Sequence, residues 1–194
     1  MTTERKAGET RRHRASSGRY LEDFKVGDIY EHWPGRTISE VDNTWFTLLT
    51  MNTNPLHFDA AYSAKTEFGR PLVDSCLTLS IVTGMSVTDV SQKAVANLGW
   101  DKVRLTAPVF AGDTIYAESE VLAVRESKSR PTQGIVTVRT TGKKADGTPF
   151  LSFERAISTR ALRAPRTRRR ACRRRTPAPS TGPCPSRDWR SPSG

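Results

Sequence analysis

The sequence is poor in cysteine and histidine, and it has no long apolar run. Its three cysteines have neither metal-ligand spacing nor the pairing of a disulfide framework: Cys76, Cys172 and Cys184. We therefore expect no metal site and a reducing, cytoplasmic setting. No apolar stretch reaches the roughly 18–20 residues that cross a bilayer, and the first residues lack the apolar core of a signal peptide. These absences argue against a membrane protein and against a disulfide-rich secreted one.

The net charge of +11 is unevenly distributed. Residues 1–19 carry six Lys or Arg against two Glu, and residues 160–194 carry eleven Arg against one Asp. Residues 20–159 carry fourteen basic and seventeen acidic residues, so this part is slightly acidic. We expect a basic disordered leader over 1–19, one folded domain over 20–159, and an Arg/Pro-rich disordered tail over 160–194.

The arginine-rich tail allows two interpretations. It could be an arm that binds nucleic acid or another anionic surface. Its composition is also what a GC-rich gene yields when it is read out of frame, and the change after Thr159 falls abruptly within a predicted strand. Few aromatic residues lie between the arginines, which argues against base stacking. We favour a frame-shifted or otherwise non-functional tail and do not expect nucleic acid as a partner.

Helices are predicted in the first half of the folded domain. Ser39 and Asp42 fit a capping box for a helix that runs to about Leu49. Three apolar residues at helical spacing are expected to form its buried face: Val41, Trp45 and Leu48. Asp59 can cap a short helix over 60–64. From Leu72 to about Ser91 the chain is apolar on nearly every side, which predicts a buried central helix with Cys76 and Met85 in the core.

The remaining segments predict an antiparallel sheet. One or two short strands are expected over 29–38 around Pro34-Gly35, and longer strands over 98–105, 113–125, 134–143 and 150–159, with Asp146-Gly147 as a hairpin turn. A sheet wrapped around the long helix buries both, so the predicted class is α+β. An edge strand of such a sheet invites pairing with a second copy.

The segment Met51-Asn52-Thr53-Asn54-Pro55-Leu56-His57 places a histidine after a polar loop. Histidine titrates near neutral pH and can transfer a proton during catalysis. The alternative is a structural loop, in which Asn54 and Pro55 shape a turn and His57 only satisfies a hydrogen bond. The residues alone leave both interpretations open.

This segment and the helix after it resemble the MaoC-type dehydratases, which include (R)-specific enoyl-CoA hydratases on the hotdog fold. The resemblance covers about residues 20–159, and it shares Asn-Pro-Leu-His at the family's spacing. Met51 and Asn52 stand where that signature has a glycine and a catalytic aspartate. The stretch Asp74-Ser75-Cys76-Leu77-Thr78-Leu79 resembles the branch that interconverts mesaconyl-CoA and β-methylmalyl-CoA. The resemblance implies a hotdog fold, with a long central helix wrapped by an antiparallel sheet, and a homodimer.

The resemblance also implies roles for individual residues. His57 would be the acid/base, Asn52 would hold the water, and Ser75 would offer the N–H that polarises the thioester carbonyl. Thr83 falls where the family has an orienting serine. Three further residues are predicted to bind substrate: Asn54, Arg70 and Arg104. The two arginines would pair with a substrate carboxylate or a CoA phosphate. The alternative is that both are ordinary surface arginines.

The implied activity is the reversible hydration of a 2-enoyl-CoA to a 3-hydroxyacyl-CoA, with short branched or dicarboxylic acyl groups as candidate substrates. No cofactor is implied, since coenzyme A is part of the substrate. An acyl-CoA thioesterase and a non-catalytic acyl-CoA-binding hotdog subunit stay open as alternatives. An amide cannot take a proton at neutral pH. Asn52→Asp should therefore raise activity if Asn52 limits a general hydratase.

Overall fold

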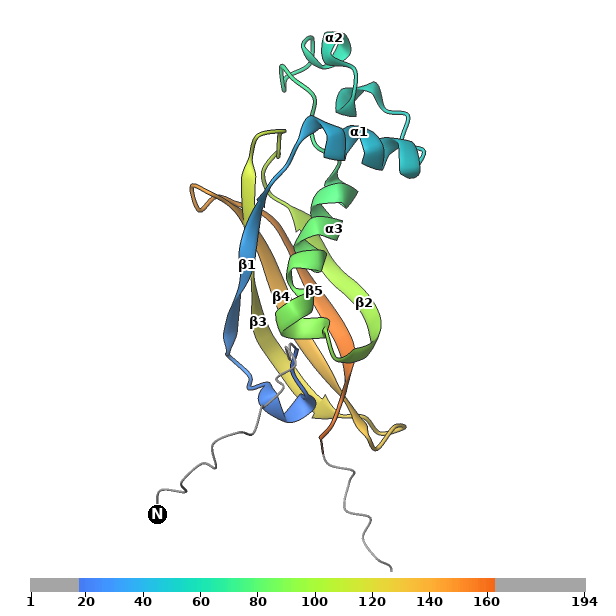
Figure 1. The fold of residues 1–194 in the computed structure, drawn as a ribbon, viewed down its shortest axis with the longest axis vertical. Helices are drawn as coiled ribbons and strands as arrows, with labels where there is room; N and C mark the ends of the chain where they lie inside the picture. Colours follow the sequence, from blue (N-terminus) through green and yellow to red (C-terminus); the bar gives the residue numbers. More distant parts are fainter. Residues whose placement is uncertain (1–17, 163–194) are drawn as a thin grey trace, which may run out of the picture.

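The computed structural model describes residues 18–162, which form a five-stranded antiparallel sheet curved around one helix (Figure 1). The strands lie in the order β1-β3-β4-β5-β2. Their bounds are Ile29–Thr37 (β1), Ala94–Leu105 (β2), Thr114–Glu126 (β3), Gln133–Lys144 (β4) and Pro149–Arg160 (β5). The α+β class is confirmed. The predicted leader and tail lie almost wholly outside the described residues.

Helix α3 (Ser75–Met85) lies against the inner face of the sheet and forms the centre of the core (Figure 1). Val82 is fully buried and approaches β4 at Gly142, where an added Cβ would lie 2.9 Å from the Val82 side chain. The predicted central helix is therefore confirmed, but it is shorter than expected. A π-helical turn, η3 (Val87–Ser91), follows it. No helix within residues 18–162 is long and apolar enough to cross a membrane.

The turns follow the sequence signals closely. Gly147 has φ +86°, which a glycine adopts without strain, and it closes the predicted hairpin between β4 and β5. The segment around Pro34 forms one strand rather than two, because β1 keeps its pairing with β3 across a register shift between His32 and Arg36. A short 3-10 helix, η1 (Leu21–Asp23), precedes β1.

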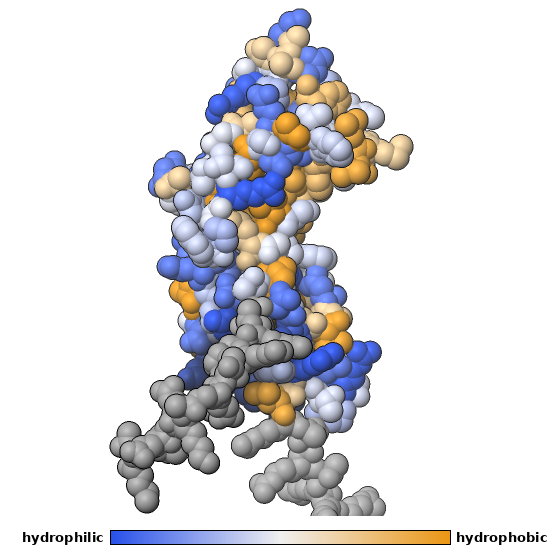
Figure 2. Space-filling view, in the orientation of Figure 1, coloured by the Kyte–Doolittle hydropathy of each residue, from blue (hydrophilic) through white to orange (hydrophobic). Residues whose placement is uncertain are grey.

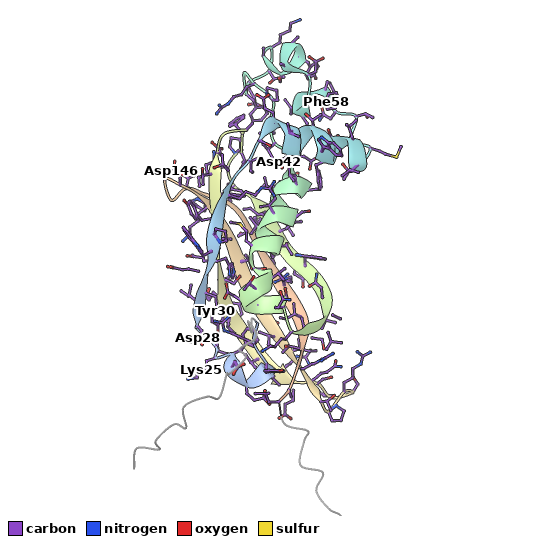
Figure 3. The ribbon with its side chains drawn as sticks, in the orientation of Figure 1. Lys25, Asp28, Tyr30, Asp42, Phe58 and Asp146 are labelled. Carbon is purple, nitrogen blue, oxygen red and sulfur yellow. The ribbon has the colours of Figure 1, made fainter. Side chains whose placement is uncertain are left out.

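Three helical segments form an overhang beyond one end of the sheet (Figure 1): α1 (Glu40–Leu49), the 3-10 turn η2 (Pro55–His57) and α2 (Ala60–Ser63). The capping box of α1 is confirmed, since Ser39 Oγ accepts the Asp42 N–H and the Asp42 carboxylate accepts the Ser39 N–H. Asp59 caps α2 through the Tyr62 N–H, as predicted. Figure 3 places Asp42 and Phe58 in this overhang.

The predicted buried face of α1 is wrong for the single chain. Val41, Trp45 and Leu48 are 63%, 64% and 72% exposed, whereas Asn43 and Thr47 on the other face are buried. The physical reason is that α1 lies beyond the end of the sheet, so no second layer of this chain covers its apolar side. Figure 2 shows apolar side chains gathered at this end of the molecule.

The core prediction for Cys76 is also wrong, because Cys76 is exposed on the side of α3 that faces away from the sheet. Helix α3 packs on one sheet only, so its all-round apolar character buries only part of its circumference. Met85 does pack against the core as expected.

Strand β2 is an open edge of the sheet, hydrogen-bonded on one side to β5. It exposes five large apolar side chains: Val95, Leu98, Trp100, Val103 and Leu105. An exposed apolar edge strand is a surface that usually pairs with another chain.

A polar network around the buried His32 ties β1 to η3, the turn that follows α3. The His32 side chain has no exposed surface, and its Nδ1 lies 3.0 Å from the Asp89 carboxylate while its Nε2 lies 2.7 Å from Ser119 Oγ. Arg19 also bonds to Asp89. Burial lowers the pKa of His32, and the interaction with Asp89 offsets only part of that effect.

This network predicts a pH-dependent stability. The unfolded chain takes up a proton on His32 near the ordinary histidine pKa of about 6.5, whereas the folded chain does so only at lower pH. The unfolded state therefore binds more protons below that value, so the free energy of unfolding falls as pH falls through it. We expect urea unfolding to show this loss between neutral and mildly acidic pH. The profile of His32→Gln should be flatter, and equal slopes for both proteins would contradict the prediction.

Candidate active site

The loop after α1 and the turn η2 carry three of the predicted site residues: Asn52, Asn54 and His57. Met51 adopts a left-handed conformation with φ +56°, which explains why a glycine suits this position. Asn52 follows, with its N–H bonded to the Thr47 carbonyl. The Asn52 Oδ1 accepts the Asn54 N–H, and Asn54 Oδ1 in turn accepts the Leu56 N–H and caps η2. Asn54 thus shapes the loop, and its predicted contact with substrate stays a prediction.

His57 ends η2 and is held in one tautomer. Its Nδ1 lies 2.9 Å from the Leu72 carbonyl oxygen, which can only accept, so Nδ1 carries the proton. In the neutral ring Nε2 is then left with its lone pair, the form that a general base requires. The structure therefore gives His57 both a structural bond at one nitrogen and an available base at the other.

Asn43 links α1 to both segments that flank the site. It is 4% exposed, and its Nδ2 donates to the carbonyl oxygens of His57 (2.7 Å) and Leu72 (3.1 Å). Its Oδ1 accepts the Asp74 N–H at 2.8 Å. One buried amide thus fixes the backbone around the histidine and the backbone that leads into α3.

Asp74 is the N-cap of α3 and the carboxylate nearest to Asn52. Its Oδ1 accepts the N–H groups of Cys76 and Leu77, and its Oδ2 accepts Asn52 Nδ2 at 2.5 Å. Ser75, the first residue of α3, stands next to it. Within residues 18–162 no hydrogen bond engages the Ser75 N–H. That N–H lies at the positive end of the helix dipole, as the assignment to the thioester carbonyl requires.

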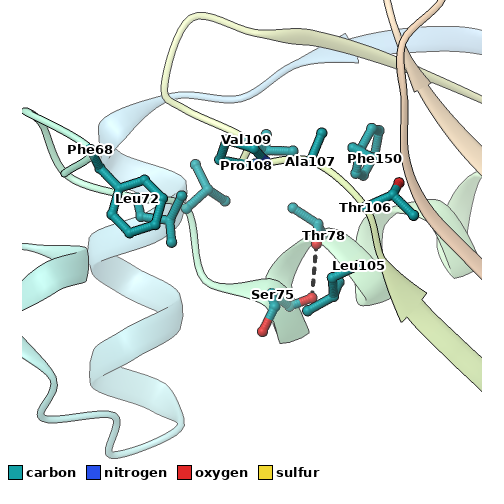
Figure 4. A pocket seen from close by; sticks show the side chains of 11 residues that line it. Phe68, Leu72, Ser75, Thr78, Leu105, Thr106, Ala107, Pro108, Val109 and Phe150 are labelled. Atoms are coloured by element: carbon teal, nitrogen blue, oxygen red, sulfur yellow. Dashed lines mark hydrogen bonds between the residues drawn. The ribbon is translucent and has the colours of Figure 1, made fainter.

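A cavity of about 320 Å³ opens beside the start of α3 (Figure 4). Ser75, Thr78 and Thr106 supply its hydroxyl groups; Thr78 Oγ1 donates to the Ser75 carbonyl and Thr106 Oγ1 to the Pro149 carbonyl. Apolar side chains form most of the remaining wall, including Phe68, Leu72, Leu105, Val109 and Phe150. A second hollow, of about 440 Å³, lies in the overhang and includes Asn52, Met51 and Phe58. Ser75 and Asn52 therefore line different hollows. Asp74 connects the two residues, because it precedes Ser75 in the chain and its carboxylate bonds to Asn52.

The other predicted residues lie farther from this cluster. Thr83 lies on α3 about two turns beyond Ser75, with a buried Oγ1 that has no hydrogen-bond partner among residues 18–162. Arg70 lies over the ring of Phe110 at 4.0 Å. Burial raises the pKa of Asp113, but hydrogen bonds from Lys144 and the Phe110 N–H, with a smaller contribution from the charge of Arg70, bring it below its ordinary value. Arg104 lies on β2, and its guanidinium bonds to the Val103 carbonyl. Hydrogen bonds link Asn52 to Asp74 and His57 to the Leu72 carbonyl, so both are tied to the segment that leads into Ser75, whereas the guanidinium of Arg104 bonds on β2.

Sequence reasoning missed Asn43 and Asp74. A signal for Asp74 was present, because Asp-Ser before an apolar run is a good N-cap pattern. Asn43 gave a weaker one: asparagine is unfavourable inside a helix, so its presence there suggests a specific hydrogen-bonding task. Neither pattern reveals the partner, since Asn52 and Asp74 are brought together only by the fold.

Taken together, the curved antiparallel sheet and the single central helix define a hotdog domain. The chain belongs to the MaoC-like dehydratase family, whose model, described as a MaoC like domain, matches residues 23–144. The hotdog fold predicted from the resemblance is confirmed.

Named relatives fit this assignment. The chain is 33% identical over 147 residues to a mesaconyl-CoA hydratase of Cereibacter sphaeroides, covering 76% of this chain and 43% of the relative. It is 40% identical over 83 residues to an (R)-specific enoyl-CoA hydratase of Aeromonas caviae, covering 43% of this chain and 61% of that protein. The chain thus spans less than half the length of the mesaconyl-CoA hydratase that it matches.

Solved structures agree. A putative MaoC domain protein dehydratase from Chloroflexus aurantiacus superimposes with a TM-score of 0.75 at 29% identity, covering 88% of this chain and 46% of that one. A Mycobacterium tuberculosis protein with a double hotdog fold gives a TM-score of 0.68 at 26% identity, covering 74% of this chain and 44% of that one.

Proposed function

We propose that this chain catalyses the reversible addition of water to a 2-enoyl-CoA, giving a 3-hydroxyacyl-CoA. The observation that carries the proposal is the state of His57: its Nδ1 is engaged by the Leu72 carbonyl, which leaves Nε2 unprotonated in the neutral ring. A base is thereby held at the end of the loop that carries the amide Asn52, whose side chain bonds to Asp74, the N-cap of α3. These are the groups that such a hydration needs.

In the proposed reaction Asn52 and His57 hold one water molecule. His57 Nε2 takes a proton from the water as its oxygen bonds to the β-carbon, and the electron pair of the double bond moves toward the thioester. The same nitrogen then returns a proton to the α-carbon, so water is added without net change in the enzyme. The dehydration is the same path in reverse.

The thioester oxygen gains negative charge in this reaction and needs a hydrogen-bond donor. The Ser75 N–H is well suited, because the Asp74 side chain engages the next two N–H groups of α3 and not this one. The helix dipole favours charge at the same point. Thr83 is assigned the orienting role further along α3, where its buried hydroxyl has no protein partner within residues 18–162.

A short acyl group is proposed as the substrate. The cavity beside Ser75 is only about 320 Å³ and carries three hydroxyl residues among apolar walls. The similarity to a mesaconyl-CoA hydratase and to a β-methylmalyl-CoA dehydratase supports a branched or dicarboxylic C4–C5 acyl-CoA. The reaction as written uses no resident cofactor, since coenzyme A enters with the substrate. The cytoplasmic setting also stays a prediction.

A homodimer is proposed as the working form. The open β2 edge and the uncovered face of α1 are apolar surfaces that a second copy would bury. The chain covers 44% of a protein with a double hotdog fold, so two copies would together approach the size of that unit.

The test is loss of enoyl-thioester absorbance with crotonyl-CoA and with mesaconyl-CoA, recorded beside release of free thiol from a saturated acyl-CoA. Hydration supports the proposal, and the better substrate sets its class. Thiol release without hydration would instead identify a thioesterase. Acyl-CoA binding without either reaction would identify the non-catalytic subunit.

A further inference from the structure

Asn52 and Asp74 form a side-chain pair whose orientation is fixed from both sides. Asn52 Nδ2 donates to Asp74 Oδ2 at 2.5 Å, and Asn52 Oδ1 accepts the Asn54 N–H at 3.1 Å. A carboxylate can only accept and a backbone N–H can only donate, so the amide cannot be turned over without losing both bonds. The face that Asn52 presents to its hollow is therefore set by Asp74.

Asp74 is itself firmly held. It is 4% exposed, its Oδ1 accepts two backbone N–H groups of α3, and its own N–H donates to Asn43 Oδ1. The carboxylate thus has three hydrogen-bond donors: the Cys76 N–H, the Leu77 N–H and the Asn52 amide. Together with the helix dipole, they offset the cost of burying its charge.

An aspartate at position 52 would change this balance. It would place two carboxylates at hydrogen-bond distance, where they repel each other strongly unless they share a proton. The resemblance puts an aspartate at 52, but in this chain a carboxylate already stands at 74. The residues at positions 52 and 74 therefore depend on each other: one is an amide and the other a carboxylate, so the pair carries one negative charge.

We propose that Asp74 is a positioning residue of the hydration site, supplying through Asn52 the negative charge that an aspartate at position 52 would carry. The inference rests on the proposed function. It reverses the expectation drawn from the sequence for Asn52→Asp: this single change lowers activity, and it restores activity only when Asp74 becomes Asn at the same time.

The experiment compares four proteins: the wild type, Asn52→Asp, Asp74→Asn, and the double variant with both changes. Asparagine is a good helix N-cap, so position 74 keeps its structural task in both of its variants. Asp59→Asn, the same change at the cap of α2, is the matched control and should leave turnover unchanged. The readouts are kcat and KM for enoyl-CoA hydration, across pH, together with urea unfolding.

We expect each single variant to lose about 10²-fold in kcat at neutral pH, the scale of a misplaced catalytic group, with little change in KM. The double variant should recover to within about tenfold of the wild type, a non-additivity expected of residues in direct contact. In Asn52→Asp the two carboxyls share a proton only at lower pH, so its kcat relative to the wild type should fall as pH rises. A role limited to capping would give no recovery and no such pH trend.

Additive losses in the double variant would overturn the inference, as would a gain in Asn52→Asp alone. Failure of the proposed function appears separately, as absence of hydration by the wild type. The pairing is then decided by unfolding of the same four proteins. Coupled changes in the free energy of unfolding support a joined pair, and additive ones refute it.

Discussion

His57→Asn lowers the rate of enoyl-CoA hydration by about 10³-fold, within the range for loss of a general acid/base, while the protein stays folded. The choice of asparagine follows from the geometry. Its amide N–H can take the place of His57 Nδ1–H and donate to the Leu72 carbonyl, but it has nothing in place of Nε2. The variant thus separates the structural bond from the proposed base.

The measurement is kcat for crotonyl-CoA and mesaconyl-CoA, with urea unfolding of the same preparation. His57→Ala provides the comparison, since it removes both the structural bond and the base and should lose stability as well as activity. If His57 only shaped the loop, His57→Asn would keep most of the wild-type turnover, and that result would return His57 to the structural interpretation.

Asn43→Ala is expected to have the second large effect, a fall in the free energy of unfolding. The substitution leaves the Asp74 N–H and the His57 carbonyl without this partner, whereas the Leu72 carbonyl keeps its bond from His57 Nδ1. Each unsatisfied buried group costs about 1–3 kcal/mol. Because the vacated space admits some water, we expect the free energy of unfolding to fall by about 2–5 kcal/mol. Turnover should fall too, because the loops that carry His57 and Asp74 lose their common anchor.

Thr47→Val is the matched control for this prediction. Thr47 is buried on the same face of α1, but its hydroxyl donates only to Thr44 within the helix, so its loss should cost less than about 1 kcal/mol. Chemical unfolding of the two variants measures the difference. Equal and small losses would mean that Asn43 is not the anchor of the site.

Local signals in the sequence predicted local structure well. The capping box at Ser39, the cap at Asp59 and the hairpin at Asp146-Gly147 all depend on neighbours a few residues apart, and all are confirmed. The loop that carries His57 lies where its polar residues predicted it. What the sequence did not show is the contact between Asn52 and Asp74, because 22 positions separate them and only the docking of α3 beside the overhang joins them.

The face of α1 illustrates a different limit. The spacing of Val41, Trp45 and Leu48 correctly marks an apolar side, but a periodic pattern does not say which layer covers it. The same holds for Cys76, where an apolar helix was expected to be enclosed and is instead covered on one side. Composition predicts that a surface is apolar, whereas topology decides what covers it.

The open β2 edge and the uncovered α1 face bear on how the stability of this chain should depend on its concentration. If a second copy buries these surfaces, folding and association become one equilibrium, and mass action makes the melting temperature rise with protein concentration. A melting temperature that does not vary across a wide concentration series would mean that one copy is stable with its apolar edge in water. If the melting temperature does vary, the stability of the folded chain depends on protein concentration as well as on its sequence.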